Sequence, residues 1–264
     1  PANPPDWWPR EWAARITDLI DNYQPDLLYT DGGIPFGEIG RSVVAHFYNR
    51  NMELHGGKLE AVYNIKDFRK RDTQHGEYHD GIAVEDLERG ILLGIKDEPW
   101  QTDTSVADWF YRKGYKYKTA TDVIHLLADI VSKNGNLLLN FTQHPDGTLD
   151  HESEIILAEL AEWMPLNGEA IYGTRPWAKV GEGPNVGNTK ERFNEASATR
   201  DSRDVRFTTK GGVVYAIVLG WPGDGALYTI NSFAPVALPK GVSRVSLLGS
   251  SGDLTWRQDD AGLH

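Results

Sequence analysis

The segment LLYTDGG, residues 27–33, decides the fold, together with SKNGNLLLNF, residues 132–141. Each contains a short apolar run bounded by turn residues, which is typical of a buried strand of a parallel sheet. The first run ends in a carboxylate, Asp31, that is followed by two glycines. β/α barrels present catalytic groups at the carboxyl ends of their strands. The pattern therefore predicts parallel α/β architecture and marks Asp31 as a candidate catalytic acid.

The chain around these two runs alternates between helical and strand patterns. Apolar residues recur at helical spacing in four segments, which are 11–23, 38–50, 121–133 and 151–166. Strands are predicted at 26–30, 59–65 and 136–141. Residues 66–118 are polar and without periodicity, and they predict one long loop of the kind that is usually functional. These elements amount to only part of a (β/α)8 barrel, which needs eight strands and eight helices.

The composition changes after residue 176. Residues 176–196 are rich in Gly, Pro, Asn and charged residues, which predicts a linker or long loop. Five β-rich runs follow: VRFTTK, VVYAIVLGW, ALYTINSF, VSRVSLLG and LTWRQD. Short runs between Gly, Pro and Asp turns favour an antiparallel β-sandwich. The predicted domains are a partial β/α barrel over 1–180, a linker over 181–198 and a partial β-sandwich over 199–264.

Composition excludes several classes of partner. The formal net charge of -11 argues against nucleic acid, which favours a basic surface. No apolar run approaches the roughly 18 residues of a membrane span. The amino-terminal PANPPDWWPREW has neither a basic nor a hydrophobic signal region, and it looks like a chain that begins in mid-domain. Localisation stays open between extracellular, periplasmic and cytoplasmic, since there is no cysteine whose pairing would indicate a compartment.

The carboxylates suggest hydrolysis of a glycosidic bond, which usually takes two acids. Asp31 is the first candidate, although an aspartate that caps a helix or forms an Asx turn would give the same pattern. The second acid is expected in residues 66–118. The residues alone do not choose among the candidates, each of which is more commonly a solvated acid: Glu77, Glu85, Asp86, Glu88 and Glu98.

A metal site is conceivable at His75, Glu77 and His79, because alternate residues of a strand share one face. There is no HExxH motif and no second ligand cluster, so a solvated charged loop is the better interpretation. Trp100 and Trp109 flank QTDTSVAD and could stack on a sugar, or pack as loop aromatics beneath the barrel rim.

Several segments, in this order, resemble the glycoside hydrolase family 29 α-L-fucosidases. They are YQPDLLYTDGG, LERG, PWQTDTSVADWFY, DIVSKNGNLLLN, PDGTLD and WMPLNGEAIYGTRPW. The resemblance runs from about Trp12 to Pro184. It implies a retaining α-L-fucosidase that acts on a fucosylated oligosaccharide or glycoconjugate without a metal or organic cofactor.

The resemblance also implies roles for individual residues. Asp31 matches the family's nucleophile, and Glu88, in DLERG, best matches the general acid/base. Four further residues match positions that contact the sugar, with Trp109 packing on the fucose methyl group: Tyr29, Lys66, Trp100 and Trp109. Tyr29 stands where the family usually has Trp, and Trp109-Phe110-Tyr111 stands where it often has WGY.

The resemblance further implies a chain truncated at both ends, without the amino-terminal half barrel that grips the sugar hydroxyls. Half a barrel exposes raw sheet edges, which are a liability. Three explanations stay open: a second copy or another chain completes the barrel, the polypeptide rearranges, or the chain is a fragment of a longer product. Two alternatives remain at this point. One is a non-catalytic, fucosidase-like module that binds carbohydrate or a partner protein, and the other is a different glycosidase with the same pair of carboxylates.

Overall fold

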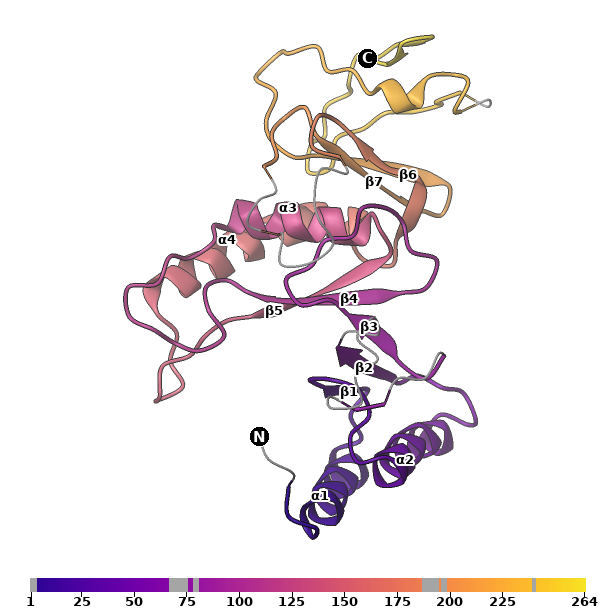
Figure 1. Ribbon diagram of the computed structural model, residues 1–264. Coiled ribbons are helices and arrows are strands. Elements are labelled where there is room, and N and C mark those ends of the chain that lie inside the picture. The colour runs from indigo at the N-terminus through magenta and orange to yellow at the C-terminus, as the bar shows by residue number, and fades with distance from the viewer. Residues whose placement is uncertain (1–3, 67–75, 78–80, 187–194, 196–198, 239–240) are drawn as a thin grey trace. The chain divides into compact units, whose positions relative to one another are not determined.

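The computed structural model describes the chain except residues 1–3, 67–75, 78–80, 187–194, 196–198 and 239–240, which are drawn in grey in Figure 1. The chain forms two compact units. The first unit comprises Pro1–Glu88 and Pro99–Gln101, and the second comprises Arg89–Glu98 and Thr102–His264. Because these units divide the chain differently from the predicted domains, the domain boundaries stay a prediction.

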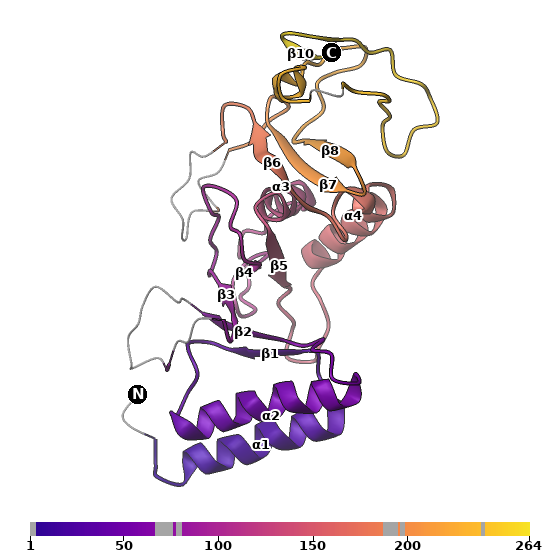
Figure 2. The ribbon, with the colours of Figure 1, turned by 90° about the vertical axis from the view of Figure 1, so that its right-hand side faces the viewer.

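The first unit is a small α/β layer. Its elements are α1 (Trp8–Tyr23), β1 (Leu27–Thr30), α2 (Glu38–Leu54), β2 (Val62–Lys66) and β3 (Val84–Asp86). β1 pairs in parallel with β2, and β2 with β3. Figure 2 shows α1 and α2 side by side along one face of these strands. The core between the layers is formed by Ile20, Val43, Phe47, Tyr63 and Ile65. The two predicted strands, 26–30 and 59–65, and the two predicted helices of this region are confirmed to within a few residues.

The segment 66–118 is not one long loop, and this part of the prediction is wrong. It contains β3 and also β4 (Trp100–Ser105), which pair in parallel. Every residue of β4 is buried, yet five of its six side chains, at Gln101–Ser105, carry hydroxyl, amide or carboxyl groups. A buried strand made of polar residues shows neither apolar alternation nor an apolar run, so periodicity cannot reveal it.

The second unit continues the sheet and adds two helices. Its elements are the rest of β4, α3 (Ala120–Val131), β5 (Gly135–Asn140) and α4 (His151–Asn167). The strand order of the whole sheet is β1-β2-β3-β4-β5. Thr119 and Asp122 form a capping box that begins α3. Asn134, with φ of 70°, turns the chain from the end of α3 into β5.

A separate antiparallel sheet follows, so the predicted fold class is confirmed. Its strands are β6 (Arg175–Glu182), β7 (Val205–Lys210) and β8 (Val213–Val218), in that order across the sheet. A two-stranded ribbon of β9 (Gln258–Asp259) and β10 (Gly262–Leu263) lies near the carboxyl end.

Two details of the carboxyl-terminal prediction are wrong. Most of β6 lies in residues predicted as a loop. Gly181 lies in that strand, and the position requires glycine because a Cβ there would lie 2.0 Å from the backbone oxygen of Val205 on β7. The runs ALYTINSF and VSRVSLLG form no named strand, and a 3-10 turn, Asn231–Phe233, occupies part of the first. Glycine, which usually signals a turn, thus concealed β6. The β-prone residues of ALYTINSF and VSRVSLLG suggested two strands that do not form.

A buried ion cluster joins α3 to β7 within the second unit. The Asp129 carboxylate binds Lys133 Nζ at 2.7 Å, Arg206 Nε through a short contact and Arg200 Nη2 at 3.7 Å. The four side chains are nearly inaccessible, with exposures between 1% and 6%. Burial raises the pKa of the Asp129 carboxyl, but the three cations outweigh burial and hold this pKa below its ordinary value. This cluster therefore holds a buried carboxylate whose charge is balanced by Lys133, Arg200 and Arg206.

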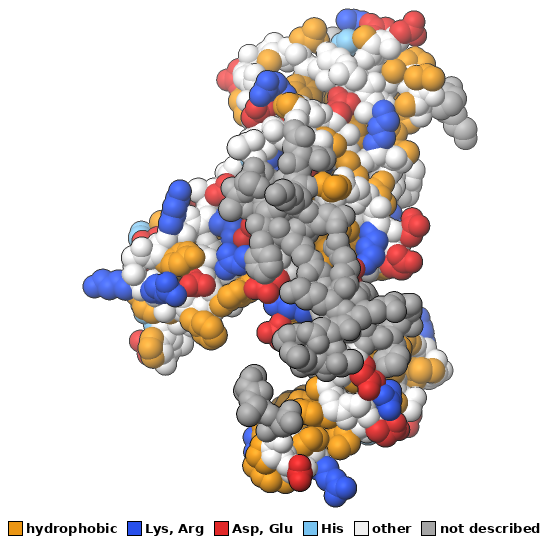
Figure 3. Space-filling model, viewed as in Figure 1, with side chains coloured by type: hydrophobic (Ala, Val, Ile, Leu, Met, Phe, Trp, Pro, Cys, Tyr) orange, Lys and Arg blue, Asp and Glu red, His pale blue; other side chains and the backbone are white. Residues whose placement is uncertain are grey.

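Hydrophobic side chains are exposed on the first unit. Figure 3 shows them over α1, where Trp7, Leu19 and Tyr23 are exposed. The expectation that a second copy or another chain completes the barrel stays a prediction. Among the described residues, no helix is long and apolar enough to cross a membrane.

Candidate active site

Asp31 follows β1 in a tight turn that the local sequence requires. The Thr30 hydroxyl lies 3.2 Å from the Gly33 carbonyl oxygen, to which it donates, and 2.7 Å from the hydroxyl of buried Tyr63. A Cβ at Gly33 would lie 2.5 Å from the carbonyl oxygen of Glu77, because Ile34 and Glu77 exchange two backbone hydrogen bonds of 2.8 Å. The turn leaves the Asp31 side chain 78% exposed at the carboxyl end of its strand.

Lys66 brings the two predicted catalytic carboxylates together. It is the last residue of β2, and its Nζ lies 3.2 Å from Asp31 Oδ1 and 3.3 Å from Glu88 Oε2. Glu88 follows β3, the next strand of the sheet. The carboxyl ends of three neighbouring strands therefore supply an acid, a cation and an acid.

The electrostatics of this triad suit bond-breaking chemistry. Lys66 is 16% exposed and Glu88 29% exposed, so their ion pair is better shielded from water than the pair with Asp31. The ammonium offsets the repulsion between two neighbouring carboxylates. One exposed acid beside one shielded acid can divide the work of attack and proton transfer.

The other candidate acids occupy different surroundings. Glu77 pairs with Arg41, which also binds Glu38 at 2.6 Å. Glu85 and Asp86 are buried within β3, and Asp86 accepts a hydrogen bond of 2.5 Å from Gln101. Glu98 is exposed.

The metal alternative gains nothing from the described part of the chain. His75 and His79 lie outside the described residues. Among those described, no group of three or more His, Cys, Asp or Glu side chains could hold a metal ion.

The aromatic residues predicted to contact the sugar lie in different parts of the structure. Tyr29 lies on β1, two residues before Asp31 and opposite Asn64 of β2. Trp100 is completely buried at the amino end of β4, where it pairs with Glu85. The structure does not bring Trp100 to the carboxyl ends of the strands, where Asp31 and Glu88 lie.

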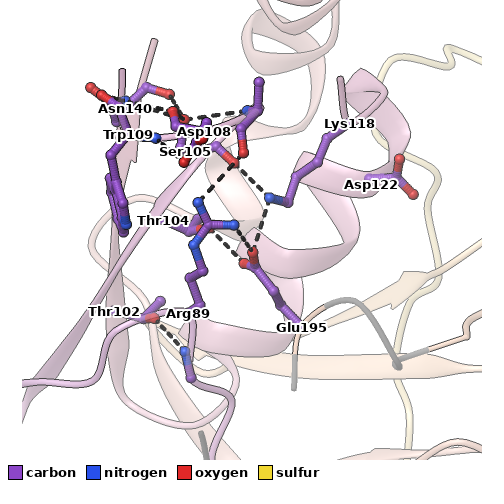
Figure 4. Close-up of polar contacts among 12 residues, drawn as sticks. Arg89, Thr102, Thr104, Ser105, Asp108, Trp109, Lys118, Asp122, Asn140 and Glu195 are labelled. Carbon is purple, nitrogen blue, oxygen red and sulfur yellow. Dashed lines mark hydrogen bonds and ion pairs between the residues drawn. The ribbon is translucent and has the colours of Figure 1, made fainter. Parts of the chain in front are cut away.

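Trp109 belongs to a polar cluster of the second unit (Figure 4). The guanidinium carbon of Arg89 lies 4.9 Å from the centre of its ring, and its own backbone N–H donates to Asp108 Oδ1 at 2.8 Å. Glu195 lies beyond Arg89 and also contacts Lys118. No sequence pattern points to Lys118 or Glu195, whereas Arg89 directly follows Glu88 in LERG.

Comparison with known proteins agrees with this fold. The Alpha-L-fucosidase family model matches residues 2–169, and the Alpha-L-fucosidase C-terminal domain model matches residues 199–264. Tissue alpha-L-fucosidase of Rattus norvegicus is 30% identical over 252 residues, which is 92% of this chain and 48% of the relative. The chain spans about half the length of the curated relatives it matches.

Solved structures show the same fold at low sequence identity. Thermotoga maritima alpha-fucosidase has a TM-score of 0.66 at 21% identity, over 98% of this chain and 52% of the other. A family 29 α-L-fucosidase from Bacteroides thetaiotaomicron, solved as a trapped covalent intermediate, has a TM-score of 0.64 at 18% identity, over 97% and 56% of the two chains. Since the first family model alone covers well over half of its residues, this chain belongs to the α-L-fucosidase family.

Proposed function

We propose that the protein hydrolyses terminal α-L-fucosyl linkages of oligosaccharides or glycoconjugates by a retaining double displacement. The observation that carries this proposal is the pair of carboxylates, Asp31 and Glu88, on one ammonium at the ends of neighbouring strands. The curated relatives bear the name of the same activity. With both acids present, nothing favours the non-catalytic alternative.

In the first step, an Asp31 carboxylate oxygen attacks the anomeric carbon while the Glu88 carboxyl donates its proton to the departing glycosidic oxygen. This gives a fucosyl ester on Asp31 and a free alcohol. In the second step, Glu88 takes a proton from water, the water oxygen attacks the anomeric carbon, and the ester bond breaks. The Bacteroides relative, captured as a covalent intermediate with 2-fluoro-fucosyl fluoride, supports this route.

The spacing of the acids is compatible with retention. The two distances to Lys66 Nζ set an upper limit on the separation of the bound oxygens. That limit does not exceed the lower end of the roughly 6.5–9.5 Å typical of inverting enzymes, whose acids must leave room for a water. Retaining enzymes need about 5–5.5 Å.

Lys66 has a role in both steps of this scheme. Its ammonium orients Asp31 for attack, and it stabilises the Asp31 carboxylate as the ester breaks. Tyr29 and Trp109 are proposed to shape the sugar pocket, with the methyl group of fucose against Trp109, whereas Trp100, buried at the amino end of β4, lies away from the two acids.

The proposal is tested by the stereochemistry and the site of labelling. Proton NMR during hydrolysis of 4-nitrophenyl α-L-fucoside should show α-L-fucose forming first. Incubation with 2-fluoro-fucosyl fluoride should add one fluorofucosyl group to the peptide that contains Asp31. First-formed β-fucose, or a label on another peptide, would overturn the mechanism, and a panel of other aryl glycosides would reveal a different glycosidase.

Replacing Glu88 by alanine should produce a loss that depends on the leaving group. General acid catalysis contributes about 10²–10⁴-fold, and a poor leaving group needs the proton most. We expect Glu88→Ala to lose about that factor on a fucosyl disaccharide and far less on 4-nitrophenyl α-L-fucoside. Glu159→Ala, which removes an exposed glutamate of α4, serves as the control. An equal loss on both substrates would assign the acid to another residue, with Glu85, Glu77 and Glu98 next.

Removing the Trp109 ring should weaken discrimination between fucose and its 6-hydroxylated analogue. A methyl group in an apolar pocket is worth about 10–200-fold in selectivity. We expect Trp109→Ala to lose most of the preference for 4-nitrophenyl α-L-fucoside over the α-L-galactoside, measured as the ratio of kcat/KM. Phe110→Ala, which removes the exposed neighbouring ring, is the matched control. An unchanged ratio in Trp109→Ala would leave Trp109 a packing residue.

A further inference from the structure

A buried carboxylate, Glu195, contacts Arg89, which in turn lies against the ring of Trp109, the residue proposed to contact the sugar. Its side chain is 6% exposed. Oε1 lies 3.0 Å from Lys118 Nζ and 3.5 Å from Arg89 Nη1, and Oε2 accepts a hydrogen bond of 2.6 Å from the Thr104 hydroxyl (Figure 4). Both oxygens are therefore engaged, and charge-assisted contacts of this kind hold a side chain in one place.

Arg89 lies between this carboxylate and the Trp109 ring. Its guanidinium carbon is 4.9 Å from the ring centre, within the range of a cation–π interaction. Nη2 donates to the Ala107 carbonyl at 3.4 Å, and the side chain is only 20% exposed. The Arg89 backbone has a left-handed φ of 46° and donates to the Asp103 carbonyl at 2.8 Å. These contacts fix the backbone of Arg89. Glu195 contacts the guanidinium on the side away from the Trp109 ring (Figure 4).

The charges explain why the carboxylate matters. Arg89 and Lys118 both contact Oε1 of Glu195, so without its charge two shielded cations would repel each other. Lys118 has a second strong acceptor, the Ser105 carbonyl at 2.5 Å, whereas the further hydrogen bond of Arg89 is a weak one. Arg89 is therefore the cation that would move, and Trp109 would lose the planar group against its face.

We propose that Glu195 is a positioning residue that sets selectivity for 6-deoxy sugars by holding Arg89 against the Trp109 ring. This inference rests on the proposed function, in which Trp109 contacts the fucose methyl group. Selectivity for a methyl group depends on the orientation of the surface that receives it, so a ring whose orientation changes would discriminate less. Glu195 itself touches no reacting atom in this scheme.

The coupling between Glu195 and Trp109 is tested without turnover. In protein labelled with 5-fluorotryptophan, the nine tryptophans give separate ¹⁹F signals, and Trp109→Phe identifies that of Trp109. We expect Glu195→Gln, which keeps the shape and removes the charge, to shift or broaden this signal. Arg89→Lys should do the same, and the double variant should add little, as expected for residues that act in series. Glu159→Gln removes the same charge from an exposed site on α4 and should leave the signal unchanged.

Selectivity is tested with the same variants. Glu195→Gln should lower the kcat/KM ratio of 4-nitrophenyl α-L-fucoside to the α-L-galactoside by roughly threefold to tenfold, part of what a methyl contact supplies. The loss should appear mainly in KM for the fucoside, because the contact exists before and during the reaction. Glu195→Asp retains the charge and should recover part of the ratio. If Glu195→Gln fails to fold, Arg89→Lys takes its place in both measurements.

The outcomes separate this inference from the proposed function. An unmoved Trp109 signal in folded Glu195→Gln overturns the inference, and so does a moved signal with an unchanged selectivity ratio. A folded protein that hydrolyses neither substrate defeats the proposed function and with it the selectivity role, whereas the ¹⁹F signal still decides whether Glu195 holds Trp109.

Discussion

Asp31→Ala should abolish turnover of 4-nitrophenyl α-L-fucoside. Loss of a covalent nucleophile removes a whole reaction step, and in another hydrolase class it costs about 10⁶-fold in kcat. The Asp31 side chain is 78% exposed, so its removal should leave stability nearly unchanged. Release of 4-nitrophenol, followed at saturating substrate, measures the loss.

Azide provides the complementary test. A small anion can enter the space vacated by the carboxylate and attack the same face of the sugar that Asp31 attacks. We therefore expect azide to restore part of the activity of Asp31→Ala and to yield a fucosyl azide of β configuration, the inverted product. Asp26→Ala removes an exposed aspartate from the opposite end of β1 and should retain full activity. Full activity in Asp31→Ala would remove Asp31 from the mechanism.

Of the substitutions proposed here, Asp129→Ala should cause the largest loss in the free energy of unfolding. Removal of one partner from a buried ion pair typically costs about 3–5 kcal/mol, because the remaining charges are left buried without compensation. Here three cations, Lys133, Arg200 and Arg206, would be left. Urea denaturation should show this loss in the free energy of unfolding. Asp21→Ala, which breaks a surface pair with His46, should cost no more than about 1 kcal/mol. A loss of similar size in both variants would mean that the cluster contributes no more than a surface pair.

The same carboxylate predicts how stability responds to acid. The pKa of Asp129 is lower in the folded protein than the roughly 3.9 of an unfolded aspartate. The unfolded chain therefore takes up this proton first as the pH falls. The contribution of Asp129 is complete above about pH 5 and declines as the pH falls through 4 towards the folded pKa. Unfolding measured between pH 7 and pH 3 should accordingly show a shallower decline in Asp129→Asn than in the parent protein.

The sequence predicted the strands that carry an apolar run, but not their burial, since β1 has no buried residue and only Gly135 is buried in β5. The runs around Leu27–Thr30 and Gly135–Asn140 could be recognised, as could the amphipathic helices that cover them. β4 could not, because its buried side chains are polar and their hydrogen-bond partners come from tertiary structure. β6 was concealed by Gly181, which the close approach of β7 requires and which by itself signals a turn.

The site divides in the same way. Asp31 stood out because a carboxylate followed by glycines at the end of an apolar run has a physical meaning. Glu88 did not stand out among five acids, and only family resemblance selected it. Lys66 became informative once the structure placed its ammonium between the two carboxylates. Glu195 lies 91 residues from Thr104 and 77 from Lys118, and no local pattern reports contacts at such separations.

The buried cluster on α3 and β7 has a consequence for how this architecture can be recombined in evolution. Arg206 of the antiparallel sheet binds Asp129 of a helix that covers the parallel one, across 77 residues of chain. If the antiparallel sheet were moved to another protein, Arg206 would bring a buried guanidinium to a place without a matching carboxylate. The protein that lost the sheet would keep Asp129 without one of its three cations. Domains that share only a polar, loosely packed boundary are exchanged with little penalty. Here the antiparallel sheet and the helix are expected to evolve together, because loss of the charge at Arg206 or at Asp129 would require a compensating change at the other residue.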